Sequence, residues 1–263
     1  MKKPMYDGSI LSFQQKRGQE SSAFFLPFLK PGMRLLDIGC GPGNITATMA
    51  PHVGLAVGVD IQGRSIAAAN ELAETAGLSN LSFREADMTA LPFDDETFDA
   101  VFFHAVLYHQ DASMLARTLA EARRVLRLGG LVATRDADIG GNILHPDLPG
   151  LRTSLDLWQR WYEHDGPDAL QFGRRQGAIL RAHGFVPVWT GASYVNHSAD
   201  AATRHEAVGD ARRSLKSLGP KLIERGLATQ AELDQALSSW NVWGAEPDAV
   251  YLRCRCECVA QKA

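Results

Sequence analysis

The sequence predicts an α/β fold, built on a doubly wound and mainly parallel sheet. Three observations lead to this prediction. Short apolar runs alternate with helical segments about every 25 residues over 30–138. A glycine-rich loop follows the first apolar run, and an acidic residue stands at the end of each of the first three runs. Strands that alternate with helices form parallel sheets, because each helix returns the chain to the edge where the next strand begins.

The elements of this block follow in order along the chain. Residues 1–30 form a short helical lead-in before Pro31-Gly32. The expected strands are 33–38, 55–60, 80–87, 98–106 and 131–136, and the helices between them are 43–52, 63–76 and 112–127. Alanine-rich composition supports the helix 63–76, and Gly77 fits its end. Gly129 and Gly130 are expected to close the helix 112–127.

Beyond residue 138 the pattern changes. A Trp-rich helix is expected at 148–165 and another helix at 173–183, followed by a sixth strand at 184–196. A helical stretch at 198–244 then precedes the last strand at 249–260. We therefore expect one domain over 31–263 with helical cap insertions at about 141–170 and 197–247 that pack over the sheet. The cap tryptophans could form its core or line a pocket: Trp158, Trp161, Trp240 and Trp243.

Composition limits the class of protein. With 263 residues and 45% hydrophobic composition, the chain can bury one substantial core. A net charge of −3 argues against a general nucleic-acid binder. No apolar stretch approaches the ~18 residues of a spanning helix, and no apolar segment of a secretory signal follows the first lysines. We expect a cytoplasmic monomer or homodimer with no nucleic-acid or membrane partner.

Three of the four cysteines alternate along the last strand, at Cys254, Cys256 and Cys258. Alternate residues of a strand share one face, so the three thiols are expected on the same side. A metal site would need a fourth ligand and a loop that wraps around the ion, and neither is evident. We expect small core residues here and no metal.

The glycine loop points to a ligand site at the carboxyl ends of the strands. Gly39, Gly41 and Gly43 allow a tight turn and close approach of backbone N–H groups to a ligand. A dinucleotide fingerprint would place its third glycine where Asn44 stands. Asp37, just before the loop, would repel phosphates and would suit a ligand that carries positive charge.

Two further carboxylates end the next strands. Asp60 can accept hydrogen bonds from both hydroxyls of a ribose. Asp87 can accept from the exocyclic amine of adenine, while Met88 packs on the ring. Each aspartate alone could be an ordinary turn former or helix cap. Together with the glycine loop they indicate a ligand with adenine, ribose and a cationic end but no phosphate, which describes S-adenosylmethionine.

The stretches LLDIGCGPG, VGVDIQ, READMTALPFDDETFDAVFFHAVLYH and EARRVLRLGGLVATRD resemble, in order and spacing, the class I S-adenosylmethionine-dependent methyltransferases. The nearest branch is the ubiquinone- and menaquinone-biosynthesis-like one (methyltransferase domain type 11), which acts on small molecules. The resemblance implies a Rossmann-like sheet of seven strands with the last one antiparallel. It also implies methyl transfer to sulfur, nitrogen, oxygen or carbon of a small-molecule acceptor. TRDADIGG, FGRRQGAILRAHGF and ERGLATQAELDQALSSWNVWGAEPDAVY resemble a subgroup that methylates thiols of natural products.

The resemblance also implies which residues hold the cofactor. The methionine end faces Asp37, the loop and His104, the ribose lies at Asp60 with Ile61 beside the adenine, and the adenine lies at Asp87 and Met88. The full cofactor set is Asp37, Gly39, Cys40, Gly41, Gly43, Asp60, Ile61, Asp87, Met88 and His104.

The catalytic residues stay unknown at this stage. Methyl transfer from a sulfonium is an in-line displacement that mainly requires positioning of the acceptor. A thiol is already partly ionised at neutral pH, whereas an alcohol would need a base. Weak candidates for such a base are His104, His109 and Asp136, followed by Asp138 and His145. Tyr6 or Tyr108 could stabilise the cation, and Arg174 and Arg175 could clamp an acidic substrate or lie in solvent.

Two other functions stay open from the sequence alone. One is a nicotinamide-dependent oxidoreductase on a similar sheet, against which the glycine spacing and Asp37 argue. The other is a non-catalytic S-adenosylmethionine-binding protein, which the strand-end acids do not exclude.

Overall fold

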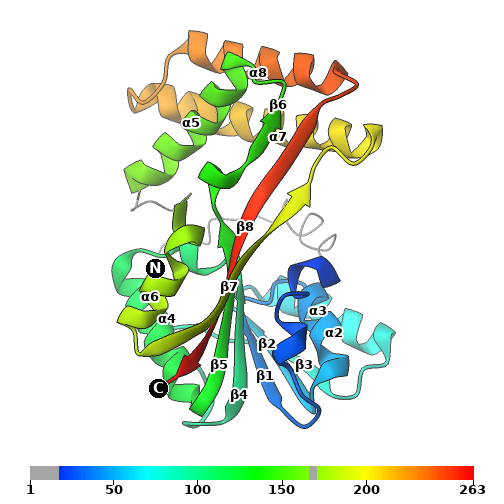
Figure 1. Ribbon diagram of the computed structural model, residues 1–263, viewed down its shortest axis with the longest axis vertical. Helices are drawn as coiled ribbons and strands as arrows, with labels where there is room; N and C mark the ends of the chain where they lie inside the picture. The colour runs from blue at the N-terminus through cyan, green and yellow to red at the C-terminus, as the bar shows by residue number, and fades with distance from the viewer. Residues whose placement is uncertain (1–17, 166–170) are drawn as a thin grey trace. The chain divides into compact units, whose positions relative to one another are not determined.

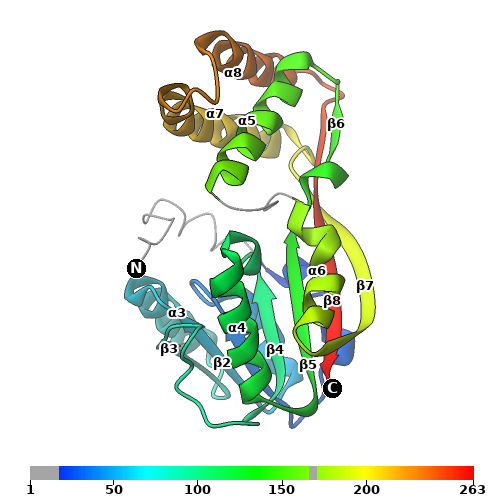
Figure 2. The same ribbon diagram turned by 90° about the vertical axis from the view of Figure 1, so that its left-hand side faces the viewer.

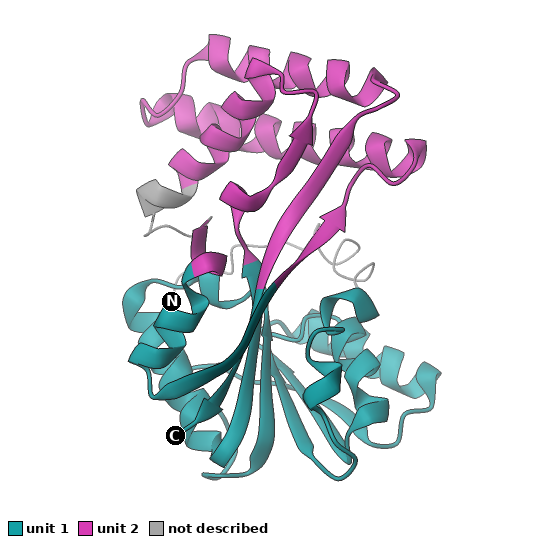
Figure 3. Cartoon of the chain, in the orientation of Figure 1, with its two compact units in different colours: residues 1–136, 175–191, 257–263 teal, residues 137–174, 192–256 magenta. Residues whose placement is uncertain are grey.

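The computed structural model describes residues 18–165 and 171–263 (Figure 1). The chain divides into two compact units (Figure 3). Unit 1 comprises the chain up to Asp136 with Arg175–Gly191 and Glu257–Ala263, and unit 2 comprises Ala137–Arg174 and Ala192–Cys256. Each unit is described below by itself.

The sheet of unit 1 is mainly parallel. Its strands are β1 (Arg34–Ile38), β2 (Leu55–Asp60), β3 (Leu81–Glu85), β4 (Phe98–His104), β5 (Leu126–Ala137) and β8 (Val250–Lys262), in the order β3-β2-β1-β4-β5-β8, and β7 (Phe185–Asn196) pairs with β8. The pairs β1–β2, β1–β4, β2–β3 and β4–β5 are parallel. The last strand, β8, runs opposite to β5 (Figure 2). The expected mainly parallel sheet with an antiparallel last strand is therefore confirmed.

Helices cover both faces of this sheet (Figure 1). On one face lie α2 (Asn44–Met49) and α3 (Gly63–Ala76), and on the other lie α4 (Ala112–Val125) and α6 (Phe172–Ala182, in unit 1 from Arg175). All seven residues of β4 are buried, as are four of the five in β1. A strand covered on both faces needs apolar side chains in both directions, which explains the continuous run in FDAVFFH.

The segment before the sheet forms two short 3-10 turns, η2 (Gln19–Ser21) and η3 (Leu26–Phe28). Phe25 is fully buried, and its ring stacks on Phe102 of β4 with centroids 6.0 Å apart. Phe24 stacks on Trp189 of β7 at 5.8 Å. The expected lead-in over 1–30 is therefore irregular where it is described, and its residues 1–17 lie outside the described part of the chain.

Unit 2 is built around three helices, α5 (Pro149–Asp165), α7 (Ala201–Glu224) and α8 (Gln230–Ala245). Trp240 and Trp243 are fully buried among them, and their indole N–H groups donate to Ser154 Oγ and to the backbone carbonyl of His145. A capping box between Thr229 and Glu232 starts α8. Trp240 and Trp243 therefore belong to the core of this unit, with every polar atom of the two indoles satisfied.

Three expected boundaries differ from the structure. The helix expected to close at Gly129-Gly130 ends at Val125, and these glycines lie inside β5, where the β4–β5 register shifts between Phe98 and Ala100. The helical stretch 198–244 is two helices, separated at Gly226, whose φ is +70°. A short strand, β6 (Ile143–His145), pairs antiparallel with β8 and was not expected. Within the described residues no helix combines the length and apolarity required to cross a bilayer.

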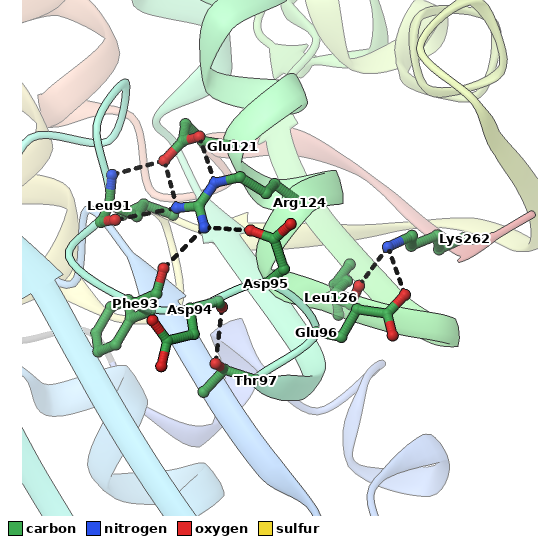
Figure 4. A network of polar contacts seen from close by, with 10 residues as sticks. All are labelled: Leu91, Phe93, Asp94, Asp95, Glu96, Thr97, Glu121, Arg124, Leu126 and Lys262. Carbon is green, nitrogen blue, oxygen red and sulfur yellow. Dashed lines mark hydrogen bonds and ion pairs between the residues drawn. The ribbon is translucent and has the colours of Figure 1, made fainter.

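One arginine fastens the loop before β4 to helix α4 (Figure 4). The guanidinium of Arg124 donates to the carbonyls of Phe93 (2.8 Å) and Leu91 (3.0 Å) and pairs with the carboxylates of Glu121 and Asp95. Glu121 in turn accepts from the backbone N–H of Leu91 at 2.7 Å. The hydrogen bonds that Arg124 donates to Glu121 and Asp95 raise the pKa of Arg124, so the guanidinium stays charged. Two side chains of α4, Arg124 and Glu121, thus hold the loop in place.

We expect Arg124→Met to lower the free energy of unfolding by about 1–2 kcal/mol, because two loop carbonyls and Glu121 lose their charged donor. Urea denaturation measures this change. Arg152→Met is the matched control, since Arg152 is 74% exposed and pairs with Asp147, whose side chain is 53% exposed. Equal unfolding midpoints for the two variants would contradict the anchoring role.

Candidate functional site

The turn between β1 and α2 requires glycine at two positions. Gly39 and Gly43 have φ values of +78° and +80°, in the left-handed region that side chains disfavour. A Cβ atom on Gly39 would come within 2.5 Å of Val106, and one on Gly43 would clash with the ring of Phe83. Gly41 between them also has positive φ, at +54°. The loop therefore brings bare backbone to the carboxyl end of the sheet.

Asp60 at the end of β2 holds this loop in place. One carboxylate oxygen accepts the N–H of Gly41 at 3.0 Å, and the other accepts the N–H of Gln62, just before α3, at 2.9 Å. Burial raises the pKa of Asp60, and the hydrogen bonds from the backbone offset part of that shift. Each oxygen keeps a further lone pair, so the carboxylate can still accept hydrogen bonds from a ligand.

Asp37 at the end of β1 is a buried carboxyl group, 2% exposed. The hydroxyl of Thr46 donates to it at 2.6 Å. Burial raises its pKa to about 7, the charge of Asp60 adds to the rise, and the Thr46 hydrogen bond opposes it. The neighbouring thiol of Cys40 is buried as well, and burial with the two carboxylates raises its pKa. A site with one buried and one half-buried carboxyl group favours a cation and disfavours a phosphate.

The end of β3 carries the next expected pair. The N–H of Ala86 donates to the backbone carbonyl of Asp60 at 3.0 Å, which joins the ends of β3 and β2. Asp87 is exposed, and one of its oxygens accepts from both the N–H and the hydroxyl of Thr89 at 2.8 Å. Met88 is half-buried, and Ile61 has 52% of its surface exposed. This edge therefore presents exposed apolar surface next to carboxylates.

His104 ends β4 and meets two charged residues inside the sheet. Its Nε2 lies 3.0 Å from Nη1 of Arg135 on β5, and Nε of Arg135 donates to Glu257 on β8, also at 3.0 Å. All three are buried, with exposures of 8%, 2% and 5%. Burial lowers the pKa of Arg135, and the charge of Glu257 opposes that shift.

The remaining candidate bases lie in different settings. His109 is in the turn after β4, with its ring centroid 3.6 Å from that of Tyr108. Asp136 is fully buried in β5. In unit 2, Asp138 receives a bidentate pair from Arg174 at 2.6 and 2.7 Å. Burial would raise the pKa of Asp138, but the hydrogen bonds from Arg174 lower it overall, so this carboxylate is a weak base.

Other residues singled out from the sequence have structural partners. Arg174, expected to lie in solvent or to clamp a substrate, pairs with Asp138. In unit 2, Trp158 donates to Ser214 Oγ at 3.1 Å, and Arg225 lies 4.4 Å over the ring of Trp161. His145 sits in β6, and Tyr6 lies outside the described residues.

The three strand cysteines are free thiols, with Cys254 and Cys258 buried and Cys256 half-buried. Burial raises the pKa of Cys256 to about 12 and that of Cys258 to about 11. Thiols in this state are poor nucleophiles and poor metal ligands. Among residues 18–165 and 171–263, no group of three or more potential ligands is placed to hold a metal ion.

The structure thus places the glycine loop, Asp37 and Cys40 at the carboxyl end of β1, next to Asp60 and Ile61 at the end of β2, and Asp60 is hydrogen-bonded to the loop at Gly41. The ends of β3 and β4 adjoin this group through β2 and β1. Sequence reasoning missed Thr46, Arg135 and Glu257. The sequence LVATRD could have drawn attention to Arg135, because a charged residue stands there within an apolar strand. No feature of the sequence marks Thr46 as the hydrogen-bond partner of Asp37.

Comparison with known proteins gives an independent result. A family model described as a methyltransferase domain matches residues 29–171. The chain is 31% identical to the probable methyltransferase ltbC of Aspergillus luteorubrus, over 98% of this chain and 95% of that protein. It is 28% identical to 27-O-demethylrifamycin SV methyltransferase of Amycolatopsis mediterranei, over 85% and 76% of the two chains.

Solved structures with the same fold include phosphoethanolamine N-methyltransferase 2 of Haemonchus contortus, crystallised with phosphomonomethylethanolamine and S-adenosylhomocysteine. The TM-score is 0.55 at 20% identity, over 93% of this chain and 53% of that one. The class I methyltransferase resemblance of the motifs is confirmed, and the finer assignment to the ubiquinone-like branch stays a prediction.

We expect Asp37→Asn to stabilise the unliganded protein increasingly as pH rises. The pKa of Asp37 is about 7 in the folded protein, above the ordinary value of 3.8. The folded state therefore binds the proton more tightly than the unfolded state, and this stabilises the fold fully below pH 3.8. The stabilisation is lost as the pH rises to and through 7. Asparagine carries no such penalty, so the difference in unfolding free energy should grow by about 1 kcal/mol per pH unit between pH 5 and 7 and then level off.

Urea denaturation at pH 5, 6, 7 and 8 measures this difference. Asp94→Asn is the matched control, because it removes an exposed carboxylate of the same unit. A difference between Asp37→Asn and the parent that is the same at pH 5 and pH 8 would show that Asp37 is not a buried, proton-binding carboxyl group.

Proposed function

We propose that this chain, which belongs to the methyltransferase domain family and is an S-adenosylmethionine-dependent methyltransferase, methylates a small natural-product molecule on a thiol sulfur. The family match, the relatives that are named as methyltransferases and the strand-end carboxylates support the class of reaction. The membership argues against the nicotinamide-dependent and the non-catalytic alternatives. The identity of the acceptor atom is the part that requires experiment.

The single observation that supports the placement of the cofactor is the pair of carboxyl groups beside the glycine loop, of which Asp37 is buried and Asp60 is half-buried. Asp37 and Asp60 have raised pKa values, which is a state that a nearby cation relieves. S-adenosylmethionine carries an ammonium and a sulfonium and no phosphate, so its charge suits these residues. A pyrophosphate group next to the same carboxylates would be repelled.

We assign the binding roles as follows. The methionine end of the cofactor is held by Asp37 and by the loop of Gly39, Cys40, Gly41 and Gly43. His104, at the end of β4, also contacts the methionine end. Asp60 accepts from the ribose hydroxyls. Ile61 and Met88 cover the faces of the adenine, and Asp87 accepts from its amine. The exposed side chain of Ile61 supports this assignment, because it offers apolar surface next to a carboxylate.

The cofactor supplies an activated methyl group on a positively charged sulfur, which leaves as a neutral thioether. The protein then has to hold the acceptor atom in line with the carbon–sulfur bond and exclude water. Buried carboxylates stabilise the cation in the ground state, so the rigid hydrogen bonds of Asp37 and Asp60 chiefly serve binding and orientation.

A thiol acceptor is supported by two points. The stretches from residue 134 onward resemble enzymes that methylate natural-product thiols. The relative named 27-O-demethylrifamycin SV methyltransferase supports a small-molecule acceptor only, because its name refers to an oxygen. A thiol also needs little help from a base at neutral pH. We further propose a cytoplasmic monomer or homodimer that does not bind nucleic acid or membranes, in keeping with the net charge of −3.

An acceptor panel tests the proposal. We expect labelled methyl transfer from S-adenosylmethionine to thiophenol and 2-mercaptoethanol, and slower transfer to phenol and aniline. Calorimetry with S-adenosylhomocysteine provides the control for cofactor binding. Tight binding of S-adenosylhomocysteine with transfer to phenol or aniline but to neither thiol would overturn the thiol assignment and leave the methyltransferase class intact.

We expect Asp60→Ala to weaken S-adenosylhomocysteine binding by about 1–3 kcal/mol, through the loss of hydrogen bonds to buried groups. Because Asp60 also holds the loop, the 2′-deoxy analogue of the ligand separates the two effects. Removal of the hydroxyl should weaken binding to the parent protein and make little difference to Asp60→Ala. An equal loss with both proteins would show that Asp60 does not contact the ribose.

A further inference from the structure

Three buried polar side chains from three strands of unit 1 form a continuous chain of hydrogen bonds, which we call the His104–Arg135–Glu257 chain. His104 and Arg135 stand opposite each other in the β4–β5 register. The N–H of Ala105 donates to the carbonyl of Arg135 at 3.0 Å, and Ala105 has a φ of +56°. The backbone on both sides of the His104 contact is therefore fixed, in a conformation that a non-glycine residue rarely adopts.

The chemistry of the contact determines the protonation of His104. A guanidinium has five donors and no acceptor. The 3.0 Å contact between Arg135 Nη1 and His104 Nε2 is thus a hydrogen bond only if Nε2 carries a lone pair. The imidazole must then be neutral, with its proton on Nδ1. A proton on Nε2 would set two donors against each other and add a second positive charge next to the guanidinium.

Glu257 stabilises the charged guanidinium of Arg135 in its buried position between β4 and β8. Burial disfavours the charged guanidinium, and the Glu257 carboxylate at 3.0 Å compensates it. The other charges that act on Arg135 are Glu20 before β1 and Asp136, the next residue in β5. A buried ion pair contributes little net stability, because removing two charges from water costs about as much as their attraction returns. The pair therefore serves better as a device for orientation than as a source of stability.

We propose that Arg135 and Glu257 are positioning residues that hold His104 as a neutral Nδ1–H imidazole, so that His104 is not the general base of the reaction. The lone pair that would accept the acceptor's proton is already used. This inference rests on the proposed function, and it favours an acceptor that loses its proton to water by its own ionisation and so needs no base. A thiol meets this condition, and an aliphatic alcohol does not.

The tautomer can be measured directly. In protein labelled with ¹⁵N-histidine, the two ring nitrogens of His104 should show a protonated Nδ1 and an unprotonated Nε2 from pH 6 to pH 8. The signals missing from His104→Gln assign the residue. In Arg135→Met the Nδ1–H signature should be lost and His104 should titrate, whereas Arg152→Met, which removes an exposed arginine, should leave the signals of His104 unchanged. A protonated Nε2 in the parent protein would overturn the proposal.

Arg135→Met leaves Glu257 without its partner, and this variant could fail to fold. The double variant Arg135→Met, Glu257→Met removes both charges and preserves side-chain volume. It should fold and should lose the Nδ1–H signature of His104 as completely as the single variant. A folded double variant that retains the signature would show that Arg135 does not set the tautomer.

Kinetics give a second readout. With thiophenol and 2-mercaptoethanol as acceptors, the pH midpoint of kcat should move from one thiol to the other in step with each thiol's own ionisation. A midpoint that is the same for both thiols and disappears in His104→Gln would identify His104 as the base and overturn the inference. The spectroscopic test needs no acceptor, so it holds even if no thiol is methylated. Absence of S-adenosylhomocysteine binding would refute the proposed function alone.

Discussion

The site depends on one electrostatic constraint: a buried carboxyl group, Asp37, and a half-buried one, Asp60, stand at the ends of adjacent strands. Asp37 and Asp60 each raise the cost of ionising the other, and burial raises it further. The structure meets the constraint with Thr46 and with backbone N–H groups, which donate without adding volume. A cation from outside the chain would complete the arrangement.

The glycines follow from the same arrangement, but they do more than admit a ligand. The space beside Gly39 is occupied by Val106, and the space beside Gly43 and Gly58 is occupied by the ring of Phe83. The loop can therefore lie against the sheet only because apolar groups of β3 and of the turn after β4 pack where side chains would otherwise be. Close packing of the loop fixes its N–H groups, and fixed donors bind without further loss of conformational freedom. Packing alone therefore requires glycine at these positions.

The sequence predicted the parts of the fold that have local causes. Strand β2 and helix α3 begin and end where their composition and flanking residues indicated, and Gly77 ends α3 in a left-handed conformation. The β5 boundary was wrong because Gly129 and Gly130 resemble a helix stop, although they accommodate an irregularity between strands. The link from Arg135 to Glu257 joins residues far apart in the chain, so no local pattern marks it. The residues at the strand ends could be identified from the sequence. Their hydrogen-bond partners could be identified only from the folded structure.

The raised pKa of Asp37 bears on which class of cofactor the site favours. With a pKa of about 7, this carboxyl group is divided between its neutral and ionised states at neutral pH. A cationic ligand interacts more strongly with the ionised state and shifts the population toward it, so binding and deprotonation favour each other. A pyrophosphate would have to act in the opposite direction, next to a second carboxylate in Asp60. In the proposed placement, the charges of Asp37 and Asp60 and the spacing of the loop glycines therefore disfavour a pyrophosphate for independent reasons, one electrostatic and one steric.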